Sequence, residues 1–119
     1  MKSYFKYSEF DSPDFPDSGR NMDATFLRML NHARQIAGIP FRINSGFRTE
    51  QHNEKVGGTE NSSHLRGFAA DIHAPSSTYR YEILSALFKA GFTRIGVAKS
   101  FIHVDADPTK TQKVIWTYA

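Results

Sequence analysis

Residues 62–71 read SSHLRGFAAD, in which small polar residues end at His64 and an apolar segment follows. Residues 68–72 favour a short strand, and Asp71 lies inside it. An ionised carboxylate in an apolar strand is costly unless it is paired with a cation or bound to a metal. This part of the chain therefore predicts a strand whose one carboxylate has a function.

A second apolar segment, FIHVD at residues 101–105, predicts another strand. Side chains two positions apart share a face of a strand, so His103 and Asp105 should lie on one face. Ile102 and Val104 should then face the core. The same alternation places Asp71 and His73 on one face of the earlier strand.

If the two strands are neighbours, His64, Asp71 and His103 converge. Two imidazoles and one carboxylate suit a zinc ion and leave a fourth position open. A zinc ion acidifies water and polarises a carbonyl group. Asp105 lies one pleat from His103, which makes it the expected general base.

A plainer interpretation of the same residues stays open at this point. His64 would cap a loop, and His103 would be a half-buried histidine with satisfied ring nitrogens. Asp71 would pair with an arginine such as Arg48 or Arg66. No metal is needed in this interpretation.

The remaining elements come from hydrophobic spacing and from turn residues. We expect helices over 22–37, 49–55 and 79–90, and strands over 41–44, 68–72, 94–97, 101–105 and 113–118. In the last long helix, Ile83, Leu84, Leu87 and Phe88 should be buried, whereas Trp116 and Tyr118 of the last strand suggest core packing. Two longer helices packed against a small antiparallel sheet give an α+β fold. Residues 1–21 should form an extended N-terminal arm, and 22–119 a single domain.

Several motifs together resemble one family. They are S-x-H-x-x-G-x-A-x-D from residue 62, SGFRT at 45–49, H-N-x-x-V-G-G at 52–58 and HVD at 103–105. Taken together, in their order along the chain, they resemble the M15 family of zinc D,D-carboxypeptidases. That family shares its fold with the hedgehog signalling domain and the vancomycin-resistance D,D-dipeptidases. The resemblance extends from about residue 22 to 105 and implies a hedgehog/D,D-peptidase-like fold.

The resemblance also implies roles for individual residues. Zinc would be held by His64, Asp71 and His103. Arg48, in the SGFRT motif, would bind substrate, which suits a guanidinium facing a carboxylate or an oxyanion. Ser45, Ser63 and His73 are further candidates for substrate contact.

One departure from the family concerns the general base. Many relatives carry an acidic residue three positions before the last ligand, and often a histidine two positions before it. Here those positions are Ser100 and Phe101. Asp105 is therefore the substitute that the sequence offers.

Composition limits the function classes. A chain of 119 residues without cysteine holds one domain and neither disulfides nor thiolate metal sites. Its net charge of +3 is spread along the chain, which argues against a nucleic-acid partner. No segment is long and apolar enough to span a membrane, and residues 1–6 do not resemble a signal peptide.

We therefore expect a monomeric zinc peptidase that hydrolyses peptidoglycan stem peptides, as a D,D-carboxypeptidase or an endopeptidase. It would be made in the cytoplasm and reach the cell wall after release, as a phage or prophage endolysin does. The alternative is an inactive zinc-binding or structural module of a virion or cell wall on the same fold.

Overall fold

The chain forms a five-stranded sheet with the strand order β1-β2-β4-β3-β5, in a computed structural model that describes residues 2–118. The strands are β1 (Ile43–Ser45), β2 (Ala69–His73), β3 (Arg94–Val97), β4 (Phe101–Asp105) and β5 (Val114–Thr117). Neighbouring strands are antiparallel except β3 and β5, which are parallel. Because β4 ends beside the start of β3, the loop 106–113 need only cross the start of β3 to begin β5 in parallel with it. The expected α+β fold is confirmed, with one parallel pair at its edge.

Three α-helices and three single-turn 3-10 helices complete the fold of residues 2–118. The α-helices are α1 (Ala24–Ala37), α2 (Glu50–Lys55) and α3 (Ser77–Lys89), and the 3-10 helices are η1 (Tyr7–Phe10), η2 (Ser18–Asn21) and η3 (Ser63–Arg66). Asp23 caps α1 by accepting from the Phe26 amide, and Ser76 caps α3 in the same way. Within residues 2–118, no helix combines the length and apolar character needed to cross a bilayer.

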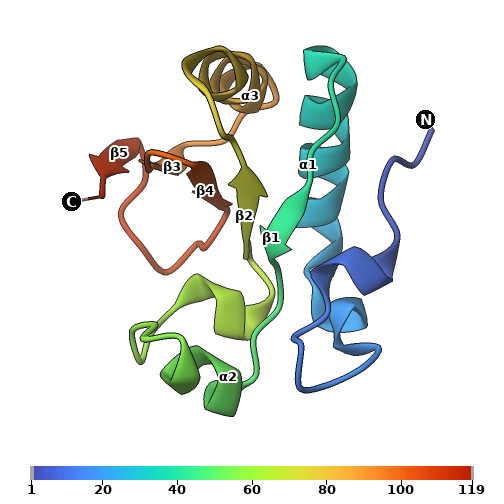
Figure 1. Cartoon of the computed structure of the whole chain (residues 1–119), viewed down its shortest axis with the longest axis vertical. Coiled ribbons are helices and arrows are strands. Elements are labelled where there is room, and N and C mark those ends of the chain that lie inside the picture. Colours follow the sequence, from blue (N-terminus) through green and yellow to red (C-terminus); the bar gives the residue numbers. More distant parts are fainter. Residues whose placement is uncertain (1, 119) are drawn as a thin grey trace.

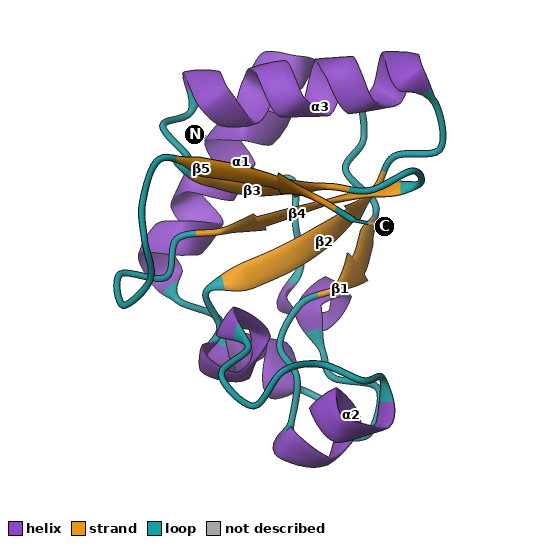
Figure 2. Ribbon diagram, turned by 90° about the vertical axis from the view of Figure 1, so that its left-hand side faces the viewer, coloured by secondary structure: helices purple, strands orange, loops and turns teal. Residues whose placement is uncertain are grey.

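The core lies between the two long helices and one face of the sheet. Figure 2 shows α3 lying along that face with α1 close to it, while α2 lies on the other side of the sheet from α3. The fully buried side chains include Phe26 and Leu30 of α1, Ile83 and Leu87 of α3, and Ile72, Ile95, Ile102 and Val104 of the sheet. The expectation for Phe88 is wrong: its side chain is 46% exposed, because it follows Leu87 on the helix and turns away from the sheet.

The N-terminal segment 2–21 runs beside α1 (Figure 1) and contributes to the same core. Phe10 is 1% exposed, and its carbonyl accepts from the Phe47 amide at 2.8 Å. Gly46 allows this approach, since a Cβ there would lie 2.7 Å from the Phe10 Cα. The segment contains η1 and η2 and is thus less extended than the sequence suggested. The division at residue 21 stays a prediction.

Candidate metal centre

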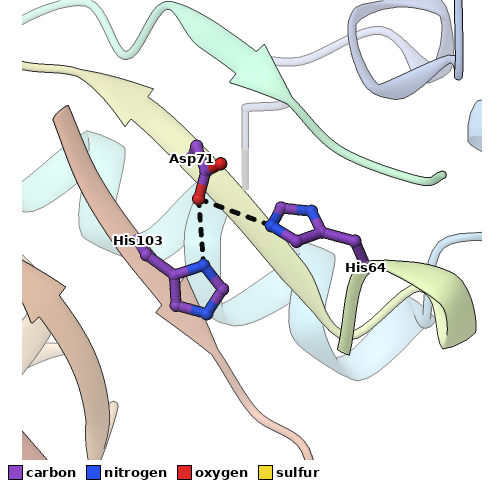
Figure 3. Close-up of side chains that lie close together, drawn as sticks. All are labelled: His64, Asp71 and His103. Carbon is purple, nitrogen blue, oxygen red and sulfur yellow. Dashed lines mark hydrogen bonds and ion pairs between the residues drawn. The ribbon is translucent and has the colours of Figure 1, made fainter. Parts of the chain in front are cut away.

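His64, Asp71 and His103 meet on the face of the sheet that is turned away from the two long helices. They come from η3, β2 and β4, and Figure 3 shows both imidazoles turned toward the Asp71 carboxylate. The antiparallel register of β2 and β4 pairs Asp71 directly with His103. One ligand atom from each residue lies within 4.8 Å of the other two.

Local structure holds His64 in place. The Ser62 hydroxyl accepts from the His64 amide at 3.3 Å, and Gly67 ends the turn with a φ of 78°. The Arg48 amide donates to the His64 carbonyl at 3.1 Å. These contacts hold both ends of η3 and place the imidazole in the cluster.

The ring of His64 is also fixed in its orientation. Its Nδ1 lies 2.7 Å from the carbonyl oxygen of Gly46, which can only accept a hydrogen bond. Nδ1 therefore carries a proton, and Nε2 is the nitrogen that faces the cluster. Nε2 lies 3.4 Å from Asp71 Oδ1.

His103 lies between two carboxylates. Its Nδ1 is 2.9 Å from Asp71 Oδ1, and its Nε2 is 2.8 Å from Asp105 Oδ2. Burial favours the neutral imidazole, but the two carboxylate contacts outweigh burial and raise the pKa of His103. Burial would likewise raise the pKa of Asp71, yet hydrogen bonds from His103 and His64 hold that pKa well below its usual range. Asp71 is therefore ionised and ready to bind a cation.

The donor set fits a divalent transition metal. Two imidazole nitrogens and one carboxylate oxygen form three-residue sites for catalytic zinc and for non-haem iron. Ligands about 2.1 Å from a tetrahedral zinc lie about 3.4 Å apart, which matches the separation of His64 Nε2 and Asp71 Oδ1. The separation of His103 Nδ1 and Asp71 Oδ1 is shorter, 2.9 Å, so this pair would have to move apart slightly to hold the ion.

Arg48 lies next to the cluster in a cavity of about 430 Å³ that all three residues line. Its guanidinium donates to Ser45 Oγ at 3.1 Å, to Asn53 Oδ1 at 3.2 Å and to Asp71 Oδ2 at 3.4 Å. The pairing of Asp71 with Arg48, which the plainer interpretation required, is therefore present. It uses Oδ2, whereas both imidazoles approach Oδ1.

The other predicted substrate residues are placed differently. Ser45 holds Arg48, and Ser63 lines the cavity while its hydroxyl donates to Asp107 Oδ2 at 2.7 Å. His73 lies opposite Phe101, and among residues 2–118 it is not part of the cavity lining. The cluster thus brings together two of these candidates and leaves His73 apart.

Asp105 lies next to His103, lines the same cavity and is 2% exposed. Its Oδ1 accepts from Arg94 Nε at 2.7 Å and from the Asp107 amide at 3.2 Å, while Oδ2 contacts His103. Burial would raise the pKa of Asp105, but the contacts with His103 and Arg94 lower it. Its role as general base stays a prediction.

Sequence reasoning missed several residues that shape the site. Arg94 anchors Asp105, and its guanidinium lies 5.1 Å from the Trp116 ring. Asp107 is fully buried and accepts from Ser63 and Arg66. Asp107 follows Asp105 by two positions, as Asp105 follows His103, so the sequence spacing could have indicated that Asp107 lies near the site. The expectation that Trp116 and Tyr118 pack in the core is wrong: both line the cavity, and the Tyr118 side chain is 44% exposed.

Comparisons with known proteins agree with this geometry. The family described as Peptidase M15 matches residues 4–105, a range that contains the whole His64, Asp71 and His103 cluster. Over 69 residues, 58% of this chain, the sequence is 38% identical to the zinc D-Ala-D-Ala carboxypeptidase of Streptomyces albus G. The aligned part spans 26% of that relative. A family match over most of the chain means that this protein belongs to the Peptidase M15 family.

Proposed function

We propose that this chain is a zinc-dependent peptidase that hydrolyses peptidoglycan stem peptides next to a D-Ala residue. The convergence of His64, Asp71 and His103 beside Arg48 carries the proposal. Two imidazoles and one carboxylate would hold the metal, with a cavity in front of it that admits a peptide. We assign this activity to the domain 22–119, with segment 2–21 packed against it.

Zinc is the metal that best fits the donor set and the family together. The donor set alone also suits iron, but a relative in the comparisons is named as a zinc enzyme. Bound zinc supplies a Lewis acid, which polarises a carbonyl group and acidifies water. The ionised Asp71 carboxylate and the His64 Nε2 atom both face the position that such a cation would take.

The substrate proposal depends on the positive charge in the cavity. Arg48 and Lys110 both line it. A guanidinium held by Ser45 and Asn53 can bind a carboxylate or stabilise an oxyanion without rearranging. A stem peptide that ends in D-Ala offers such a carboxylate, whereas cleavage of a cross-link would use Arg48 for the oxyanion.

The proposal is tested by metal analysis and by hydrolysis. Protein purified without a histidine tag should contain close to one zinc per chain by mass spectrometry. His103→Ala should lose this zinc, and His32→Ala, an exposed position on α1, should retain it. Zinc-loaded protein should release free D-Ala from pentapeptide muropeptides or open cross-linked dimers, as separated by chromatography.

Two outcomes would contradict the proposal in different ways. Protein that neither contains zinc nor takes it up would remove the metal centre. Protein that binds zinc but cleaves no muropeptide in either assay would favour the inactive binding module. An action on the cell wall in a phage or prophage context belongs to the same proposal, and lysis of purified walls by the zinc-loaded protein tests it.

A further inference from the structure

The two histidines of the cluster are held by different acceptors. The Nδ1 of His64 contacts the Gly46 carbonyl, so its Nε2 faces Asp71. His103 is reversed: its Nδ1 faces Asp71, and its Nε2 faces Asp105. A neutral imidazole has one N–H and one lone pair. If the nitrogen that faces the cluster binds the metal, His103 must carry its proton on Nε2.

Asp105 is held firmly enough to fix this arrangement. Both of its oxygens are engaged, Oδ2 with His103 and Oδ1 with Arg94 and the Asp107 amide. Arg94 in turn donates to the Thr111 carbonyl and lies against the Trp116 ring. Asp105 lines the cavity, but both of its oxygens are already engaged, so it could accept a proton from water only by giving up one of these contacts.

We propose that Asp105, anchored by Arg94, is a positioning residue that holds His103 as the Nε2–H tautomer with Nδ1 free for the metal. It does not accept the proton from water in the proposed reaction. The inference depends on the proposed metal centre. It differs from the general-base assignment in what Asp105 controls: the metal affinity and the orientation of one ring.

Such a contact has a known effect on metal sites. A histidine ligand commonly donates its second N–H to a carboxylate, and loss of that partner weakens metal binding about 10–100-fold. If Asp105 acted only as the general base, its replacement would leave metal affinity unchanged. Zinc affinity therefore separates the two roles of Asp105.

The first experiment uses the unaltered, zinc-loaded protein. Long-range ¹⁵N–¹H spectra of the histidine rings should show His103 protonated on Nε2 and bound through Nδ1. His64 should show the reverse, protonated on Nδ1, and the exposed His32 serves as the unbound reference. Zinc bound through Nε2 of His103 would overturn the inference while leaving the metal centre itself intact.

The second experiment measures zinc affinity by competition with a chromophoric chelator. Asp105→Asn should bind zinc about 10–100-fold more weakly than the unaltered protein. Arg94→Lys, which keeps a cation near Asp105 but loses the guanidinium geometry, should lose less. Asp14→Asn, a change at an exposed carboxylate, should lose none. Circular dichroism and thermal unfolding check that each variant is folded.

The outcomes separate this inference from the proposed function. If the unaltered protein binds no zinc, the proposed function fails first. If it binds zinc and folded Asp105→Asn binds equally well but no longer cleaves, Asp105 is the base and this inference is wrong. If Asp105→Asn does not fold, the tautomer of His103 in the unaltered protein still decides.

Discussion

Replacing Gly96 with alanine should disturb both the edge of the sheet and the metal centre. Gly96 lies in β3 between His103 of β4 and Trp116 of β5, and it pairs with both. A Cβ at this position would lie 2.7 Å from Cε2 of Trp116 and 2.8 Å from Cε1 of Tyr118. Carbon atoms pack at about 3.5–4.0 Å, so both rings must move by close to 1 Å.

The cost follows from this overlap. Inserting a methyl group into a filled space typically costs about 1–3 kcal/mol. With an unfolding entropy of about 2.1 cal/mol/K per residue, that cost lowers Tm by about 4–12 °C in a chain of this length. The Trp116 ring lies 5.5 Å from the His103 ring, so zinc affinity should fall too.

Thermal unfolding of the metal-free protein measures the first effect, and chelator competition the second. The matched control is the same change in a Trp116→Ala background, where the added methyl group meets Tyr118 alone. There its cost should be less than half as large. An unchanged Tm for Gly96→Ala, or an equal cost in both backgrounds, would refute the packing argument.

Three further changes test the core, a buried carboxylate and the substrate site. Leu30→Ala removes a fully buried side chain and should lower the free energy of unfolding by about 2–5 kcal/mol in urea titrations; a loss as small as that at a surface site would contradict the assigned core. Burial would raise the pKa of Asp107, but hydrogen bonds from Ser63 and Thr109 hold that pKa well below the usual range of a carboxyl group. Its carboxylate therefore stabilises the fold above about pH 4 and loses this effect as the pH falls. The difference in unfolding free energy between the unaltered protein and Asp107→Asn should shrink below that pH, and a constant difference would argue against the network. Arg48→Lys should retain bound zinc but slow muropeptide hydrolysis, because an ammonium cannot donate the paired hydrogen bonds that a guanidinium gives to a carboxylate or an oxyanion. An unchanged kcat/KM would show that Arg48 does not belong to the substrate site.

Local pattern predicted most of the elements and the three clustered residues. Alternation within β4 placed His103 and Asp105 on one face, and the structure has Ile102 and Val104 fully buried on the other. The periodicity of the two long helices likewise located them to within about two residues, because caps such as Asp23 mark their ends. Strand alternation and helix caps depend on residues that are close together in the sequence, so a single sequence is enough to predict them.

The partners of buried polar groups were less accessible. Alternation gives the face of a side chain but not the register between strands, and that register puts Arg94 beside Asp105. The acceptor for His64 is a backbone carbonyl, that of Gly46, which leaves no mark in the residue type. The parallel pairing of β5 with β3 depends on a loop crossing rather than on any property of residues 114–117.

Two of the clustered residues lie on paired strands and the third lies on a short turn, and this difference has a consequence for metal exchange. Asp71 and His103 are cross-strand partners in the middle of the sheet, whereas His64 lies on the single turn η3. A short turn opens locally at a lower free energy than a central strand pair. A chelator should therefore extract the metal through fluctuations of residues 62–67 while the sheet stays folded. The dissociation rate of the ion and the hydrogen-exchange rate of the His64 amide should then respond together to changes at Ser62 or Gly67.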